Sequence, residues 1–154
     1  GKNSLRIDVF LDVLSMSHKF DLRGRLELDY PTISLTDLLM TKLQIAELNE
    51  KDVKDMIFLM NDHDFADLDL PEKINSKYIA DLCSKDWGIY KTFTINLKKT
   101  VAYSEKIDDQ STRRRVMKQC EELLDEIEET PKTTKWKLRA KVGEKKRWYE
   151  LPES

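Results

Sequence analysis

The residues from Ser34 to Met60 constrain the fold most strongly, because their apolar side chains recur at helical spacing. The first half carries a stripe of leucines that is interrupted once, at Lys42, where the pattern calls for an apolar residue. An ammonium group in that position either extends to water along its methylene groups or enters a shared polar pocket. The stretch predicts two consecutive helices, the first capped by Ser34 or Thr36 and ending near Asn49, which caps the second.

Upstream of these helices, residues 5–12 predict a β-strand that has Asp8, Phe10 and Asp12 on one face and aliphatic side chains on the other. Carboxylates fixed on a strand can converge on Mg²⁺. The alternative is an ordinary half-buried strand whose polar face meets solvent. Residues 23–28 predict a second, shorter strand, and two strands are too little sheet to be stable alone. We therefore expect further strands from upstream residues, from the C-terminus or from a second copy of the chain in a homo-oligomer.

Beyond an acidic connector over residues 61–70, helical spacing predicts three further helices, beginning near Pro71, after Lys85 and at Ser111. The tail then alternates basic and apolar residues and predicts a basic β-hairpin with a turn at Gly143. The predicted fold class is α+β, mainly helical: a short N-terminal β unit, about five helices and a C-terminal β-hairpin. We divide it into residues 1–62 and a helical region over residues 63–154.

Composition narrows the class of protein. In 154 residues, 40% are hydrophobic and 36% are charged, with a net charge of −2. The four glycines and four prolines exclude long low-complexity linkers, and no apolar run is long enough to span a bilayer. Cys83 and Cys120 have no metal or redox spacing, which predicts two buried thiols in a reducing compartment. We expect a cytoplasmic protein without a membrane partner.

The charges are segregated along the sequence. Six acidic residues fall within residues 121–129, and eight basic residues fall within residues 132–147. The basic tail also carries Trp136, Trp148 and Tyr149, so it could contact nucleic acid through phosphates and base stacking. The alternative is that the aromatic rings are core and the lysines form a solvated face. One function class is therefore a non-catalytic interaction or nucleic-acid-binding module that uses this tail.

A second class comes from a family resemblance. The stretches IDVFLD, RLELDYPTISLTDLLMTKLQ and NEKDVKDMIFL resemble the latter part of the AbiEii-like nucleotidyltransferases of the polymerase-beta superfamily. The resemblance covers about residues 5–60. It includes a D-x4-K pattern that ends at Lys42 and a K-D-x-x-D pattern that ends at Asp55. The sequence DWG at residues 86–88 and a W-x-L-R…WY tail resemble those of uncharacterised relatives.

The resemblance implies transfer of a nucleotide from a nucleoside triphosphate to an RNA, protein or small-molecule acceptor, with Mg²⁺ holding the phosphates. Asp8 would be a metal ligand, Lys42 the nucleotide-phosphate contact and Asp55 the acid of the following helix. The family's first motif, a Gly-Ser turn followed by an acidic pair, is absent from this sequence. We therefore expect either a partial chain of an enzyme or a degenerate member that kept the scaffold, inactive as given.

Overall fold

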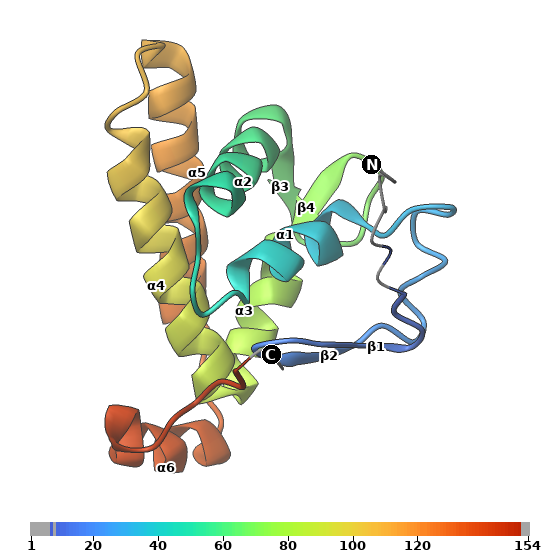
Figure 1. The fold of residues 1–154 in the computed structure, drawn as a ribbon, viewed down its shortest axis with the longest axis vertical. Coiled ribbons are helices and arrows are strands. Elements are labelled where there is room, and N and C mark those ends of the chain that lie inside the picture. The colour runs from blue at the N-terminus through green and yellow to red at the C-terminus, as the bar shows by residue number, and fades with distance from the viewer. Residues whose placement is uncertain (1–6, 8, 152–154) are drawn as a thin grey trace, which may run out of the picture.

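The computed structural model describes residue 7 and residues 9–151, and helices dominate it (Figure 1). The prediction of a mainly helical α+β chain with a short N-terminal β unit is confirmed. The described strands and helices, in chain order, are β1 (Val13–Ser15), β2 (Lys19–Asp21), α1 (Leu35–Leu43), α2 (Glu50–Asp62), β3 (Asp64–Ala66), β4 (Lys73–Asn75), α3 (Ser76–Lys85), α4 (Trp87–Ser104), α5 (Gln110–Glu129), α6 (Thr134–Val142) and the short 3₁₀ helix η1 (Gly143–Lys145). No helix in this described part is both long and apolar enough to cross a membrane.

The N-terminal hairpin, formed by antiparallel strands β1 and β2, lies elsewhere in the sequence than predicted. Leu14 pairs with Phe20 across the ladder, and both side chains are buried. The predicted strands are wrong: residue 7 and residues 9–12 have no regular structure, and residues 23–28 form turns. The reason is burial, because the described apolar side chains before β1 are exposed, Val9 at 77%. Among the described residues no third strand joins the hairpin, so a sheet completed by a second copy stays a prediction.

Helices α1 and α2 begin where the sequence predicts. Ser34 Oγ accepts a hydrogen bond from the Asp37 backbone N–H at 3.1 Å, and Asn49 Oδ1 accepts one from Asp52 at 3.0 Å. Helix α1 ends earlier than predicted, at Leu43, and there the Asn96 amide of α4 donates to the carbonyl groups of Leu43 and Ile45. The buried faces of the two helices carry the predicted apolar side chains into the core.

The acidic connector is not a simple loop, because part of it pairs with the segment before α3. Strands β3 and β4 are parallel, with Phe65 opposite Ile74. The helix predicted to start near Pro71 begins instead at Ser76. Asn75 is its cap and accepts a hydrogen bond from the Tyr78 backbone N–H at 2.9 Å. Ile74 is fully buried in the strand rather than in a helix.

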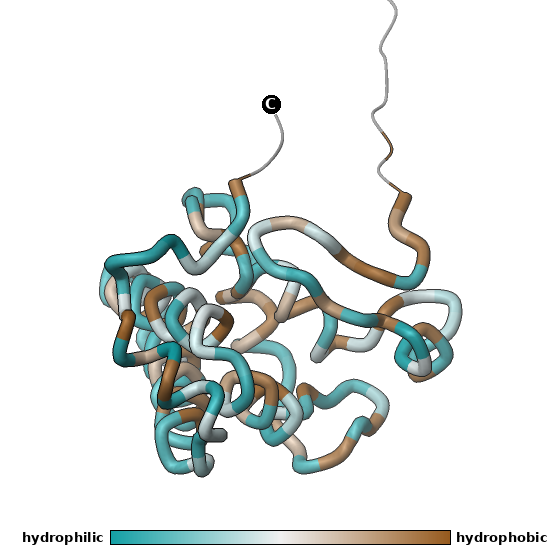
Figure 2. Tube along the Cα trace, turned by 90° about the horizontal axis from the view of Figure 1, so that it is seen from below, coloured by the Kyte–Doolittle hydropathy of each residue, from teal (hydrophilic) through white to brown (hydrophobic). Residues whose placement is uncertain are grey.

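The core lies where α3, α4 and α5 pack against one another and against α1 and α2. The helices show mixed hydrophilic and hydrophobic colouring along their length, as amphipathic elements around a shared core should (Figure 2). Cys83 and Cys120 are buried free thiols, as predicted, and burial raises the pKa of both. The core draws residues from both sides of residue 62, and the division into two regions stays a prediction.

The predicted C-terminal hairpin is wrong, because residues 134–142 form helix α6. Thr133 is its cap: the side-chain oxygen accepts a hydrogen bond from the Trp136 backbone N–H at 3.2 Å. Gly143, with a φ of 58°, ends the helix. No residue of α6 is fully buried, so its alternating apolar residues do not mark a core-facing strand. After η1, the segment of residues 146–150 returns to the N-terminal hairpin, and Glu150 N–H donates to Ser17 O at 2.9 Å.

Candidate functional sites

The first candidate site lies between α1 and α2, where the structure brings Lys42 and Asp55 together. Lys42 Nζ is 2.8 Å from Asp55 Oδ2 and 3.1 Å from Asp52 Oδ1. Burial lowers the pKa of Lys42, but hydrogen bonds to Asp55 and Asp52 outweigh it, so the pKa lies above its ordinary value. We call these three residues the Lys42 cluster. Lys42 therefore neither extends freely to water nor lies along the leucine stripe; it bridges two helices through carboxylates.

Asp37 takes no part in the Lys42 cluster, although the sequence pattern links it to Lys42. Its carboxylate is buried and accepts hydrogen bonds from Arg25 Nε at 2.7 and 3.0 Å. Arg25 also pairs with Asp69 at 3.2 Å, and its guanidinium lies 3.8 Å from the centre of the Tyr78 ring. This network holds the loop before α1 against α1 and α3, so its role is structural.

The predicted metal ligand Asp8 lies outside the described residues. Within the described range, no three His, Cys, Asp or Glu side chains are grouped so that they could hold a metal ion. The two carboxylates of the Lys42 cluster do not fit Mg²⁺ either, since the Lys42 ammonium bridges them at 2.8 and 3.1 Å. A divalent cation there would meet a positive charge already in place. We derive no chemical step through a metal.

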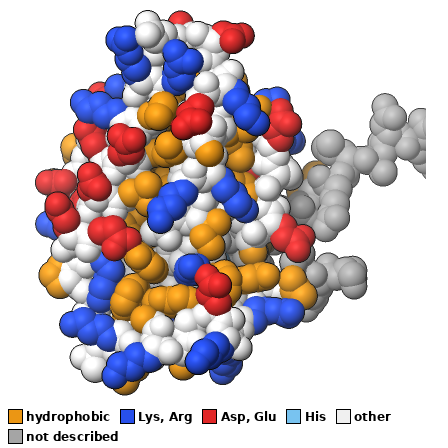
Figure 3. Space-filling view, turned by 90° about the vertical axis from the view of Figure 1, so that its left-hand side faces the viewer, with side chains coloured by type: hydrophobic (Ala, Val, Ile, Leu, Met, Phe, Trp, Pro, Cys, Tyr) orange, Lys and Arg blue, Asp and Glu red, His pale blue; other side chains and the backbone are white. Residues whose placement is uncertain are grey.

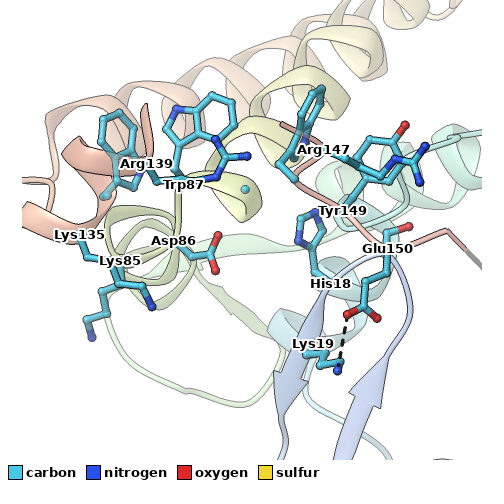
Figure 4. A pocket seen from close by; sticks show the side chains of 14 residues that line it. His18, Lys19, Lys85, Asp86, Trp87, Lys135, Arg139, Arg147, Tyr149 and Glu150 are labelled. Carbon is cyan, nitrogen blue, oxygen red and sulfur yellow. Dashed lines mark ion pairs between the residues drawn. The ribbon is translucent and has the colours of Figure 1, made fainter. Parts of the chain in front are cut away.

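The second candidate site is a cavity of about 400 Å³, which we call the α4 pocket because it lies at the first turn of α4 (Figure 4). Four segments line it: residues 17–19 of the N-terminal hairpin, residues 85–88 at the α3–α4 junction, one face of α6, and residues 147–150. A helical period brings Trp136 and Arg139 of α6 to this same cavity. The DWG and W-x-L-R…WY motifs of the sequence thus meet in one place.

Aromatic rings and one fixed guanidinium form the upper wall of the α4 pocket in Figure 4. The rings of Trp87 and Trp148 meet edge to face with 5.9 Å between their centres, and those of Trp148 and Tyr149 do so at 5.3 Å. Arg139 lies 4.7 Å from the centre of the Trp87 ring and donates to the carbonyl groups of Gly143 and Lys146, both at 2.8 Å. The wall is therefore held by several independent contacts.

The floor of the pocket contains His18, whose ring points into the cavity in Figure 4. His18 Nε2 lies 2.8 Å from Thr92 Oγ1, and the Trp148 indole N–H donates to the same oxygen at 3.1 Å. The Thr92 hydroxyl therefore links the imidazole of His18 to the indole of Trp148. Burial lowers the pKa of His18, although the charges of Asp86 and Glu150 oppose that shift. At neutral pH the His18 imidazole on the floor of the pocket is therefore uncharged.

The charge of the α4 pocket is mainly positive. Five cationic side chains and two carboxylates line it. Both carboxylates already have partners: Glu150 pairs with Lys19 at 3.5 Å, and Asp86 caps α4 by accepting from the Ile89 backbone N–H at 3.0 Å. Figure 3 shows Lys and Arg side chains gathered around apolar ones at the lower end of the molecule, where α6 lies in Figure 1. The pocket lies in the basic part of the surface.

Sequence reasoning missed the α4 pocket because it placed the tail in a hairpin. Two signals in the sequence could have predicted the helix that lines it. Thr133, two residues after Pro131, is a good helix N-cap, and Gly143 is a good residue to end the helix. Compared with protein-family models, with curated proteins and with solved structures, the chain has no match. Function must therefore be argued from these two sites.

Proposed function

We propose that this chain is part of a nucleotidyltransferase-like protein, in which α1 and α2 carry the contact to the nucleotide phosphates. The observation that carries the proposal is the pairing of Lys42 with Asp55. The resemblance implies that the D-x4-K and K-D-x-x-D patterns serve one site, and the lysine of the first lies 2.8 Å from the last carboxylate of the second.

Lys42 supplies the cation that a phosphate contact needs. The raised pKa keeps the Lys42 ammonium charged at neutral pH, and two carboxylates hold it at the helix boundary. The Lys42 side chain is 24% exposed and that of Asp55 is 38% exposed, so a phosphate oxygen would reach the ammonium from solvent by replacing the Asp55 carboxylate. In nucleotidyl transfer an acceptor oxygen forms a bond to the α-phosphorus, and the bond to the leaving pyrophosphate breaks. Lys42 would neutralise charge on the phosphates, which is the role of a point cation in such a site.

This proposal assigns binding, not complete catalysis, to the described residues. They contain no group of side chains that could hold a metal, and a metal-dependent centre would need carboxylates beyond the Lys42 cluster. We therefore expect the chain as given to bind a nucleoside triphosphate weakly and to transfer no nucleotide.

The test is nucleotide binding by matched lysine variants, measured as the fluorescence anisotropy of a labelled nucleoside triphosphate. Lys42→Met should weaken binding at least tenfold, because it removes a charge-assisted hydrogen bond to phosphate. Lys54→Met is the control, since Lys54 lies on α2 but pairs with Glu50 at the surface, and its affinity should stay within about twofold. Lys42→Arg keeps the charge and should retain most of the binding. Equal affinities in all variants, or no binding by the parent chain, would refute the proposal.

A further inference from the structure

We propose that the α4 pocket is a second binding site, for one base of a single-stranded nucleic acid with its flanking phosphates. This site uses none of the residues of the Lys42 cluster, and the inference does not depend on the proposed nucleotide transfer. Three properties of the pocket support it: aromatic surface, positive charge on two sides, and a shape fixed before any ligand arrives.

The aromatic surface is partly covered and partly available. Trp87 is buried, whereas Trp148 and Tyr149 are half-buried where they line the cavity. No described ring stacks parallel on these two, and the part of each ring that stays exposed borders the cavity. Any of the nucleobases can stack on an aromatic ring, so this contact does not depend on the nucleotide sequence. The volume of about 400 Å³ is of the size that holds a small ring-bearing ligand rather than a folded partner.

Positive charge flanks the aromatic wall on both sides. In Figure 4, Arg147 lies beside Tyr149 on one rim, and Lys85 and Lys135 lie on the opposite rim. Neither Arg147 nor Lys135 forms an ion pair with another described residue, while Lys85 pairs with Asp81 outside the pocket at 2.5 Å. A nucleotide within a strand has a phosphate on each side of its base. Cations on two rims therefore suit a strand that crosses the pocket better than a nucleotide with a single phosphate.

Contacts within the protein hold the pocket in shape before a ligand binds. Arg139 fixes the turn after α6, and the Thr92 hydroxyl joins His18 to Trp148. A site ordered in advance loses less conformational entropy when it binds. His18 lines the same cavity, and its ring nitrogen that does not contact Thr92 is left to hydrogen-bond to a base edge.

The experiment compares two double variants with the same change in net charge. Lys135→Glu with Arg147→Glu reverses one cation on each rim, and Lys137→Glu with Lys141→Glu reverses two exposed cations of α6 that do not line the cavity. Anisotropy of labelled single-stranded RNA and DNA is measured at several salt concentrations. The rim variant should lose at least tenfold in affinity and lower the salt slope by roughly two phosphate contacts. The α6 control should stay within about threefold.

Competition experiments test the base and the strand separately. An oligonucleotide with abasic sites should compete at least fivefold less well than one with bases, because it cannot stack. A mononucleotide should compete more weakly than the oligonucleotide, because it reaches one rim only. Equal losses in the two double variants would show a diffuse basic surface and overturn the proposal. Equal competition by the abasic strand or by the mononucleotide, or no binding by the parent chain, would overturn it as well.

Discussion

Thr92 Oγ1 lies 2.8 Å from His18 Nε2. The same oxygen accepts a hydrogen bond from the Trp148 indole at 3.1 Å. One hydroxyl on α4 thus joins the turn of the N-terminal hairpin to the segment of residues 146–150. Protonation of His18 therefore changes a contact on which two segments far apart in the sequence depend.

The stability of the protein should fall as the pH falls below the ordinary pKa of His18, 6.5. Burial holds the pKa of His18 in the folded chain below that value, while Asp86 and Glu150 oppose the shift. Between the two pKa values the unfolded chain binds a proton that the folded chain does not, so the free energy of unfolding decreases toward acid. His18→Gln can still bond to Thr92, and it should remove this part of the decrease. Urea unfolding of both proteins across this range measures the difference, and identical pH profiles would contradict the prediction.

Replacing Arg25 with Met should destabilise the fold by about 3–5 kcal/mol, because it leaves the buried Asp37 carboxylate without its cation. The measurement is the free energy of unfolding in urea. Arg23→Met is the matched control: Arg23 pairs with Asp21 at the surface, where an ion pair contributes little. Similar losses in the two variants would mean that the Arg25 network is no more than a surface ion pair.

Asn96→Ala should cost about 2–4 kcal/mol, since the Asn96 amide satisfies two carbonyl groups at the end of α1. Its Nδ2 donates to Leu43 O at 2.8 Å and to Ile45 O at 2.7 Å, and the side chain is almost fully buried. Asn61→Ala, which removes only a surface bond to Asp62, should change stability little. Thermal unfolding followed by circular dichroism separates the two cases, and an Asn96 variant as stable as the Asn61 variant would be evidence against this tie between α1 and α4.

Gly88→Ala should disturb the α4 pocket, although alanine is the better helix former by about 1 kcal/mol. A Cβ at this position would lie 2.7 Å from Trp148 O, a backbone atom, so the segment of residues 146–150 has to move. We expect lower stability and a changed tryptophan fluorescence spectrum. A stabilised variant with an unchanged spectrum would show that this segment does not lie against α4.

The helical part of the fold could be predicted because its signals are local. Ser34 and Asn49 cap α1 and α2 as expected, since a capping side chain needs only the next turn of its own helix. The strands could not be placed in the same way. Leu14 and Phe20 pair with each other and are buried in a core formed by residues far away in the sequence, so no local pattern marks them as strand residues. The alternation of side chains nearer the N-terminus is equally regular, but its apolar residues are exposed. In α6, the pattern of period two concealed a helix that begins at Thr134 and is capped by Thr133.

The two candidate sites differ in the same way: one depends on a local sequence pattern and the other on residues far apart in the sequence. The contact of Lys42 with Asp55 follows from two adjacent helices, and the sequence singled out both residues. The α4 pocket needs His18, Trp87 and Trp148 at once, and no local pattern relates positions so far apart. Asp52 is a further example: its backbone satisfies the predicted cap, while its carboxylate has the unpredicted contact with Lys42.

The backbone bond from Glu150 to Ser17 also has a consequence for the order of events during synthesis. A ribosome makes the N-terminal hairpin first and residues 146–150 near the end of the described chain. The helices between them can pack while the chain is still emerging. The α4 pocket, however, cannot close until Trp148 and Glu150 have left the exit tunnel. Whatever this pocket binds can therefore recognise the chain only after residues 146–150 have emerged and joined the N-terminal hairpin.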